Sequence, residues 1–364
     1  MTLELRAIRI LIAVMVVAGC SRRPPDAASV PLSAPVVSSI ALPDAPPDGV
    51  FMDYLAYDRL THRVWAPAGN TASVDVVDAN SGRVIQIAGF AIAERELRGR
   101  MRTVGPSSAT VGNGAVYVGN RADASVCRVD AVSLVVGACI TLDAQPDGLA
   151  YVASTQEVWA TMPADHSITV LDASGTALTK QATIRLDGQP EGYAVDDHSG
   201  RFYTNLEDKD RTVTIDVHSR QVSSTWPAGC GAEGPRGLAL DDQLGFLLVA
   251  CTDRVLAVDA RHDGVLLSAI AVGGGLDNID YVSARRELYA AAGRAATLTI
   301  ARLDTKGQLT MVALVPTAPG ARNAVATEAG TAYVADSPQG KLLVVAPFGS
   351  TPLNTGDRGE TRAR

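Results

Sequence analysis

Seven segments along the chain share one pattern. Each has a polar or charged residue, usually followed by Gly, Asn or Ser, and then the start of an apolar β-type stretch. They are Asp53-Tyr54-Leu55, Ser107-Ser108-Ala109, Asp147-Gly148-Leu149, Glu191-Gly192-Tyr193, Arg236-Gly237-Leu238, Asp277-Asn278-Ile279 and Arg322-Asn323-Ala324. Guanidinium groups bind anions through paired hydrogen bonds, whereas carboxylates bind cations or amines. A fold that gathers these residues would create a charged binding site in which the carboxylates outnumber the guanidinium groups.

The usual catalytic signatures are missing. The histidines all fall in predicted turns or loops, and they are His62, His166, His198, His218 and His262. A histidine-ligated metal or a Ser-His-Asp relay is therefore not expected. The sequence has no Gly-x-Ser-x-Gly elbow, no phosphate-binding glycine loop and no Cys-x-x-Cys-His haem site. We expect a protein that is not an enzyme and needs no cofactor.

Internal repeats would position the seven segments. A stretch of alternating apolar residues ending in Asp recurs at intervals near 43 residues, and a second β-type stretch precedes most copies. The copies end at Asp78, Asp130, Asp172, Asp216, Asp259 and Asp304, and a seventh ends at Ala346. Period-2 alternation and this repeat length predict four short strands in each unit. The predicted fold is all-β, a seven-bladed β-propeller with four-stranded blades.

The last repeat lacks a fourth strand, because a polar tail follows Pro347. The segment VVSSIALPDAPP at 36–47 resembles the outer-strand segment QATIRLDGQPEG at 181–192. We expect the N-terminal segment to complete the last blade and close the ring, which would hide exposed sheet edges. The propeller would span 36–348, with a disordered polar tail at 349–364.

In such a ring the seven segments surround one mouth of the central channel. The predicted ligand-binding residues there are Asp53, Ser107, Asp147, Glu191, Arg236, Asp277, Asn278, Arg322 and Asn323. Two interpretations stay open. In the structural one, Arg236 bridges Glu191 and Asp277, while Arg322 bridges Asp277 and Asp53. In the functional one these side chains bind a ligand, and the excess of carboxylates favours a cationic partner.

One interval between repeats contains extra residues, FAIAERELRGRMRTV at 90–104. Its arginines Arg95, Arg98, Arg100 and Arg102 make it locally basic, and it should project over the same mouth. A solvated loop or short helix is the simpler interpretation. A lid or a partner-docking element is the alternative.

Four cysteines remain after Cys20, an even number that suits an exported protein. Cys127 and Cys139 flank a turn symmetrically, so they would face each other across a hairpin. Cys230 and Cys251 would lie on the same face of the ring. We predict disulfides Cys127–Cys139 and Cys230–Cys251, with free buried cysteines as the alternative.

The N-terminus predicts export and lipid anchoring. Arg6 and Arg9 precede an apolar stretch at 10–17, which is too short to span a bilayer, and small residues precede Cys20. This order resembles a bacterial lipobox, so residues 1–19 would be a signal peptide. Cys20 would carry lipid such as palmitate, and residues 20–35 would form a flexible tether. We expect a periplasm-facing lipoprotein, on the outer membrane rather than the inner.

The net charge of the chain limits the kinds of partner that it is expected to bind. The formal net charge is −7, and it becomes −8 without residues 1–19, which contain two arginines and one glutamate. A surface for nucleic acid is therefore not expected. Apart from the lipid, the expected partner is an envelope protein or a small-molecule ligand, and the chain is expected to be a monomer.

The repeat GPRGLALDDQLGFLLVACTDRVLAVDA at 234–260 resembles the YVTN/YncE-type propeller repeats of exported bacterial proteins, and QPDGLAYV at 145–152 and QPEGYAVD at 189–196 match the same template. The resemblance covers roughly residues 36–347 and implies a periplasmic seven-bladed propeller. Fold alone does not fix an activity. Our expectation is therefore a binding or scaffold module for a protein, peptide or small ligand.

A more distant similarity is to the regucalcin/gluconolactonase propellers, which hold a divalent metal in the channel with Glu, Asn and Asp. Glu191, Asn278 and Asp147 would be the matching residues, and Glu233-Gly234-Pro235 is similar to a motif of that family. This similarity implies the alternative function, a metal-dependent hydrolase or lactonase.

Overall fold

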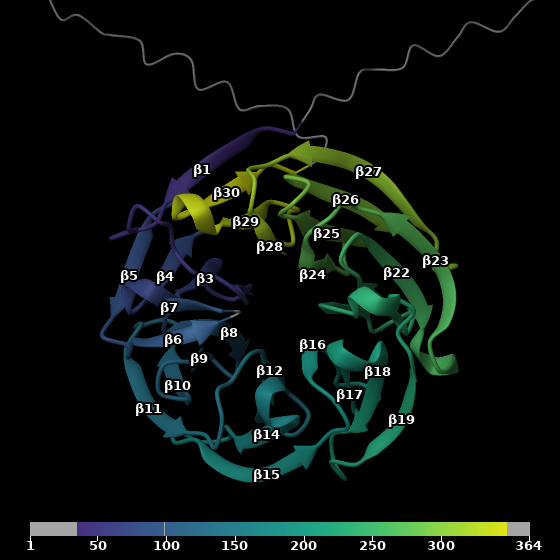
Figure 1. Cartoon of the computed structure of the whole chain (residues 1–364), viewed down its shortest axis with the longest axis horizontal. Coiled ribbons are helices and arrows are strands. Elements are labelled where there is room, and N and C mark those ends of the chain that lie inside the picture. The colour runs from purple at the N-terminus through teal and green to yellow at the C-terminus, as the bar shows by residue number, and fades with distance from the viewer. Residues whose placement is uncertain (1–34, 98, 348–364) are drawn as a thin grey trace, which may run out of the picture. The chain divides into compact units, whose positions relative to one another are not determined.

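The backbone of this computed structural model builds seven antiparallel sheets around a central axis (Figure 1). The structure describes residues 35–97 and 99–347. The predicted signal peptide, Cys20 and nearly all of the tether and the polar tail lie outside these residues. Within them, no helix is long and apolar enough to cross a membrane.

Each sheet is one four-stranded blade. Blade 1 contains β2 (Ala56–Asp58), β3 (Arg63–Ala68), β4 (Ser73–Asp78) and β5 (Val84–Ala88). Blade 2 contains β8 (Pro106–Gly112), β9 (Ala115–Asn120), β10 (Ser125–Asp130) and β11 (Val136–Thr141). Blade 3 contains β12 (Leu149–Val152), β13 (Glu157–Met162), β14 (Ser167–Asp172) and β15 (Thr179–Arg185). Blade 4 contains β16 (Pro190–Asp196), β17 (Arg201–Leu206), β18 (Arg211–Asp216) and β19 (Val222–Pro227).

The remaining blades follow the same order from the axis outward. Blade 5 contains β20 (Leu238–Asp241), β21 (Phe246–Ala250), β22 (Arg254–Asp259) and β23 (Val265–Ala271). Blade 6 contains β24 (Leu276–Val282), β25 (Glu287–Ala292), β26 (Thr297–Leu303) and β27 (Leu309–Pro316). Blade 7 contains β28 (Arg322–Ala326), β29 (Ala332–Asp336), β30 (Lys341–Val345) and β1 (Val37–Ala41). The prediction of a seven-bladed all-β propeller is confirmed.

The outer strand of blade 7 comes from the start of the described chain. β1 pairs antiparallel with β30 in a register that runs from Val37 opposite Val345 to Ala41 opposite Lys341. Leu42, just beyond β1, donates its amide to Gly340 O at 3.0 Å and is buried against blade 1 and blade 7 residues. The two ends of the ring therefore lie in one sheet.

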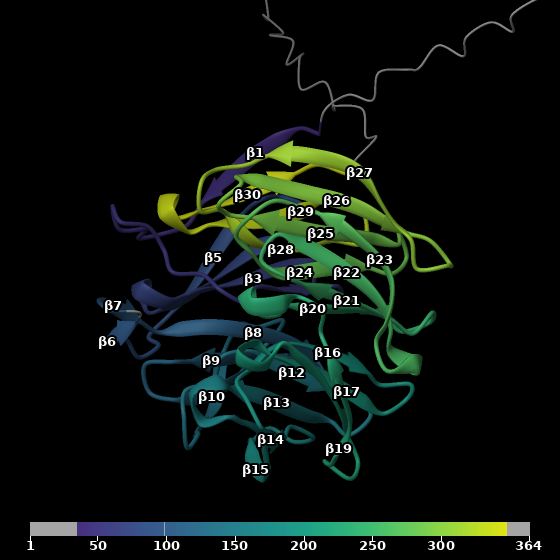
Figure 2. The same ribbon diagram turned by 45° about the vertical axis from the view of Figure 1, so that its right-hand side comes forward.

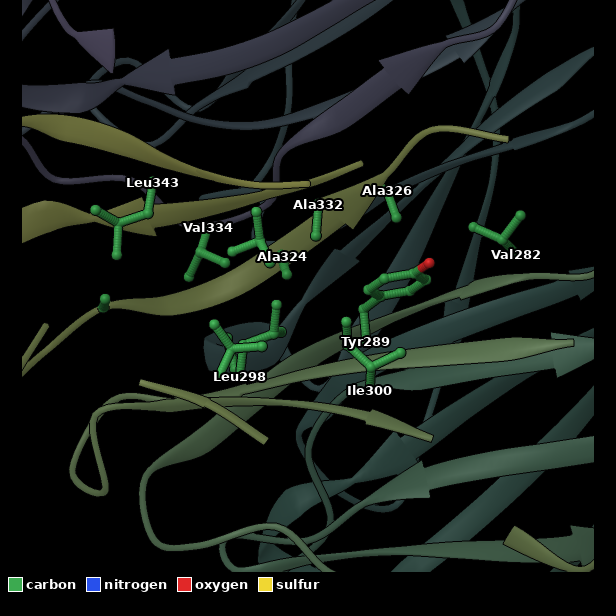
Figure 3. Close-up of a cluster of buried hydrophobic side chains, with 13 residues drawn as sticks. Val282, Tyr289, Leu298, Ile300, Ala324, Ala326, Ala332, Val334 and Leu343 are labelled. Atoms are coloured by element: carbon green, nitrogen blue, oxygen red, sulfur yellow. The ribbon is translucent and has the colours of Figure 1, made fainter. Parts of the chain in front are cut away.

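The hydrophobic core lies between neighbouring blades rather than at the axis. Figure 3 shows one such layer, in which Tyr289, Leu298 and Ile300 of blade 6 face Ala324, Val334 and Leu343 of blade 7. Similar clusters occupy the other interfaces. Because each blade buries its faces against the next, a single blade could not be stable alone.

The aspartates that end the third strands have a structural role. Asp130 accepts hydrogen bonds from the amides of Val132 at 3.1 Å and Ser133 at 2.7 Å, and Asp216 accepts from His218 and Ser219 in the same way. These bonds hold the turn to the outer strand and lower the pKa of each carboxyl. The repeated Asp thus marks the turn between the third and outer strands in blades 1 to 6.

The extra residues at 90–104 form a hairpin, not a helix. β6 (Ala93–Leu97) pairs with β7 (Arg100–Val104), and Gly99 between them has a φ of 75°, which glycine adopts without strain. The expectation of a short helix is wrong because alternation and a tight turn favour strands. Figure 2 shows the hairpin standing out from the ring.

Both predicted disulfides are present. Cys127 and Cys139 lie directly opposite each other on β10 and β11. Cys230, after β19 of blade 4, is bonded to Cys251, which follows β21 of blade 5. The second bond therefore ties two neighbouring blades together.

Candidate functional site

The seven polar residues lie where the inner strands begin. In blades 2, 4, 6 and 7 the inner strand has an irregular register at this point, for example between Glu191 and Tyr193 and between Arg322 and Ala324. Such bulges bend a strand and redirect its side chains. In blades 1, 3 and 5 the polar residue precedes the strand instead. We call the surface formed by these residues the channel mouth.

Arg121 organises one side of the mouth. It comes from the β9–β10 loop of blade 2 and forms ion pairs with Asp53 of blade 1, at 2.8 Å, and with Asp147 of blade 3. Its guanidinium also lies over the Phe51 ring, 5.6 Å from the centroid. Burial opposes its charge, but the two carboxylates outweigh burial and raise the pKa of Arg121. One buried cation thus joins three blades.

The two predicted arginines have different partners. Arg322 pairs with Asp277 at 3.0 Å, but within the described residues it forms no ion pair with Asp53, which pairs with Arg121 instead, so only half of the bridge that the structural interpretation expected is present. Arg236 instead pairs with Glu207, which lies in the β17–β18 loop. Within the described residues, no ion pair joins Arg236 to Glu191 or Asp277. The prediction that Arg236 bridges Glu191 and Asp277 is therefore wrong, because Arg236 pairs with the carboxylate of the loop residue Glu207.

The asparagines link blades through the backbone. Asn323 donates to Asp53 Oδ1 and to Asp53 O, both at 3.1 Å, and its own Oδ1 accepts the amide of Asn278 at 3.0 Å. The Asn323 φ of 60° places its side chain for both contacts. These bonds join blades 6, 7 and 1 around the mouth.

Glu191 is the carboxylate without a pairing partner. No hydrogen bond or ion pair to its carboxylate is present among residues 35–97 and 99–347, although its carbonyl accepts from Thr204 at 2.9 Å. Burial, together with the nearby charges of Asp147 and Asp277, raises the pKa of Glu191 well above its usual value. Burial likewise raises the pKa of Asp147 to about 6 despite its pairing with Arg121.

Negative charge exceeds positive charge at the mouth. The charged groups are the carboxylates Asp53, Asp147, Glu191, Glu207 and Asp277 and the guanidinium groups Arg121, Arg236 and Arg322. With every group ionised the cluster would carry a net negative charge in a poorly solvated place. A proton or an external cation would relieve that cost.

Several polar atoms at the mouth are buried and have no hydrogen-bond partner among the described residues. They are Tyr54 Oη, Ser107 Oγ, Ser108 Oγ, Asp147 Oδ2 and Asn278 Nδ2. Leaving such an atom unsatisfied costs about 1–3 kcal/mol. A cluster of them at one place indicates a site that a bound group would complete.

Beneath the mouth the channel contains a small cavity. Its volume is about 190 Å³, and Asp53, Tyr54, Tyr193, Asn278 and Asn323 contribute to its lining. The rings of Tyr54 and Tyr193 stack across the axis with centroids 5.7 Å apart. A second cavity of about 260 Å³ continues along the axis and shares Tyr193 and Asp280 with the first.

A larger hollow, about 550 Å³, lies away from the axis between blades 3 and 4. Its lining includes Arg185, Lys209 and Val222, which are exposed, and none of the predicted site residues. Volume alone therefore does not mark the site, since buried unpaired atoms such as Tyr54 Oη and Asp147 Oδ2 lie at the mouth, whereas none of the residues lining this hollow contributes such an atom.

The residues proposed for a metal do not form a prepared ligand set. Asp147 already pairs with Arg121, and Asn278 presents an amide nitrogen that lacks a partner. Within 35–97 and 99–347, no group of three or more His, Cys, Asp or Glu side chains could hold a metal ion. The histidines lie in turns, as His62 and His166 illustrate with positive φ values.

Sequence inspection missed Arg121 and Glu207. The two occupy equivalent positions, each directly after the second strand of its blade. A charged residue at that point is therefore a signal that was present in the repeat pattern, and it faces the same mouth as the first residue of the inner strand.

Comparison with known proteins shows the fold and no more. No family model and no curated protein matches the chain. A chain of the mitotic checkpoint complex is similar with a TM-score of 0.69 and 15% identity, covering 93% of this chain and 99% of that one. Hydrazine synthase of Kuenenia stuttgartiensis has a TM-score of 0.68 at 14% identity, covering 83% and 97%. A streptogramin B lyase has a TM-score of 0.66 at 12% identity, covering 86% and 98%.

Proposed function

We propose that this chain is a non-catalytic binding or scaffold module that receives a protein, peptide or small ligand at the channel mouth. The observation that carries the proposal is the cluster of buried polar atoms without partners at that mouth, among them Tyr54 Oη and Asp147 Oδ2. Buried atoms of this kind need an ordered water, an ion or a ligand to complete their hydrogen bonds. A ligand that supplies the missing hydrogen bonds would be held firmly.

The hairpin β6–β7 supports a protein partner. Arg95 donates to Ala122 O at 3.1 Å, next to Arg121, so the hairpin is held beside the mouth. Its exposed surface includes Ile92, 49% exposed, and Met101, 64% exposed. Exposed apolar side chains next to an unsatisfied polar site are typical of docking surfaces. Similarity to a chain of the mitotic checkpoint complex also suits a role in protein assembly.

We further propose that the module is a YncE-type lipoprotein anchored to the cell envelope through Cys20. Two disulfides favour an oxidising compartment outside the cytoplasm. Labelling of cells with a radioactive palmitate precursor tests the anchor. The protein should be labelled and sediment with membranes, and Cys20→Ala should lose both properties. Labelling that survives the substitution would contradict the anchor.

Capture from an envelope extract tests the binding role. Purified protein with Asn278→Ala should lose the partner that the unaltered protein retains, because this change removes an unsatisfied donor at the mouth. Glu328→Gln is the matched control, since Glu328 follows β28 at the opposite face of the ring and pairs with Arg59. Equal capture by both variants would contradict a role for the mouth.

The alternative function is that of a metal-dependent hydrolase or lactonase of the gluconolactonase type. The similarity of the fold to a streptogramin B lyase is compatible with this alternative. Elemental analysis of purified protein separates the two functions. We expect no stoichiometric Ca²⁺ or Zn²⁺. A stoichiometric metal that is lost on Asp147→Ala or Glu191→Ala would favour the enzyme.

A further inference from the structure

The hydrogen-bond acceptors without partners at the channel mouth indicate which chemical group the mouth binds. Among the described residues, the carboxylate of Glu191 in blade 4 has no hydrogen bond or ion pair, and one carboxylate oxygen of Asp147 in blade 3, Oδ2, is buried and has no partner. Both carboxylates lie near Tyr54, because the Tyr54 ring stacks on that of Tyr193, which follows Glu191 by two residues and packs against Gly148, next to Asp147. The mouth therefore offers two carboxylate acceptors, which come from the neighbouring blades 3 and 4.

Tyr54 is an independent sign of a ligand. Its side chain is 8% exposed, and its hydroxyl is buried without a hydrogen-bond partner in the described part of the chain. Burial, and after it the negative charges of Glu191, Asp147, Asp53 and Asp277, raise the pKa of this hydroxyl. A tyrosine hydroxyl placed among carboxylates and bonded to none of them is available to accept a hydrogen bond from a cation.

The cations already at the mouth are committed elsewhere. Arg121 holds Asp53 and Asp147 Oδ1, Arg322 holds Asp277, and Arg236 holds Glu207. None of these guanidinium groups bonds to Glu191. The Glu191 carboxylate is therefore left to a proton or to a cation from outside the described residues, and one unit of positive charge suits one free carboxylate.

The geometry of the acceptors distinguishes between kinds of cation. A guanidinium is a flat fork that matches the two oxygens of a single carboxylate, whereas a primary ammonium has three donors on a compact, rotatable head. The free acceptors here belong to three residues on blades 1, 3 and 4. A divalent metal would need several oxygens around one point, and the described residues form no such group.

We propose that the channel mouth binds a primary ammonium group, which donates to Glu191, Asp147 Oδ2 and Tyr54 Oη. The rings of Tyr54 and Tyr193 stack with their centroids 5.7 Å apart, which fixes the position of the Tyr54 hydroxyl. This inference rests on the proposed function and names the chemistry of its ligand. The ammonium belongs either to a free amine or to a lysine side chain of a partner protein.

Isothermal titration calorimetry with n-butylammonium chloride tests the inference directly. Saturable binding should weaken about tenfold or more in Glu191→Gln, because a charged hydrogen bond is lost, and about threefold in Tyr54→Phe. Glu328→Gln, on the opposite face, should bind like the unaltered protein. Tetramethylammonium, which has no N–H donor, should bind much more weakly.

Each outcome has a definite meaning. Equal affinity for butylammonium in Glu191→Gln and Glu328→Gln would overturn the inference, as would tighter binding of guanidinium or of tetramethylammonium. A thermal melt of each variant checks folding, and the conservative Tyr54→Phe change provides the result if Glu191→Gln unfolds. No saturable binding of butylammonium by the folded protein would also overturn it.

Acetylation of the lysines in the envelope extract distinguishes the two sources. Loss of capture after acetylation identifies a partner lysine, and retained capture together with butylammonium binding identifies a free amine. If capture depends on Asn278 but neither Glu191→Gln nor acetylation affects it, the proposed function stands and the ammonium inference fails. If Asn278→Ala also leaves capture of the partner unchanged, the proposed function itself is contradicted.

Discussion

Asn323 in the last blade donates its amide to Asp53 ahead of the first blade, 3.1 Å from Nδ2 to Oδ1, although the two residues are 270 positions apart. This contact joins the ends of the ring at the inner side, and the pairing of β1 with β30 joins them at the outer side. Asp53 also holds Arg121, so the joint between the chain's ends is part of the channel mouth.

The outer joint should contribute strongly to stability. The bonds from Leu42 N to Gly340 O and from Ala346 N to Val36 O place the even-numbered amides of β1 toward β30. Ser38→Pro should therefore remove a ladder hydrogen bond and lower the free energy of unfolding by about 1–3 kcal/mol. Ser39→Pro is the control, because its amide points away from β30. Urea unfolding measures both, and equal losses would contradict this role of β1.

Arg121 should be essential to the fold of the mouth. Arg121→Ala leaves Asp53 and Asp147 without their cation, which should cost about 3–5 kcal/mol. Adding Asp147→Asn should restore part of the loss, because it removes one of the stranded charges. Arg185→Ala is the control, since Arg185 is 66% exposed in its pair with Asp165, and it should cost less than about 1 kcal/mol. Denaturant unfolding of the unaltered protein, Arg121→Ala, Arg121→Ala with Asp147→Asn, and Arg185→Ala measures these free energies. If Asp147→Asn restores none of the lost stability, the pairing of Arg121 with Asp147 is contradicted.

The buried Asp75 on β4 predicts a pH dependence. Burial raises the pKa of this carboxyl to about 7, although hydrogen bonds from the Ser73 and Gln86 side chains act to lower it. The folded state holds its proton more tightly than the unfolded state, so this stability is present at low pH and is lost as pH rises toward 7. Asp75→Asn should remove the loss. Between about pH 5.5 and about pH 8 the variant should gain about 2 kcal/mol relative to the unaltered protein. A constant difference across this window would contradict the shift.

The disulfides should stabilise the ring to different extents. Cys127–Cys139 closes a loop of 12 residues in sequence separation, and Cys230–Cys251 closes one of 21. Replacing either pair with serines should cost about 2–4 kcal/mol, and the longer loop should cost more. Thermal melts of the two double variants test this order. A larger loss for the shorter loop would show that loop length does not govern the effect here.

The repeats made most of the fold predictable. The third strands of blades 1 to 6 end in or are followed by an Asp that caps a turn, as Asp130 and Asp216 do, so the pattern carried a structural signal in six of the seven units. The segment at 36–41 was recognisable because it repeats the outer strand of another blade. Both disulfides were predicted from where the cysteines fall relative to the expected strands.

The site was predictable in position but not in its pairing. The repeats placed Glu191, Arg236 and Arg322 at one mouth, yet they could not say that Glu207 would take Arg236 or that Arg121 would join two carboxylates. Which carboxylate pairs with which arginine depends on how far each loop extends into the channel mouth. The hairpin at 93–104 was also missed, because only its tight turn at Gly99 distinguishes it from a loop.

Photocrosslinking in the native envelope tests the central claim most directly. A photoreactive residue at Met101, on the hairpin beside the mouth, should crosslink to a partner, and Asn278→Ala should abolish that product. The same residue at Leu266, 59% exposed on the outer strand of blade 5, should give none. Crosslinks of equal strength at both positions, or only at Leu266, would show that the mouth is not where this protein binds.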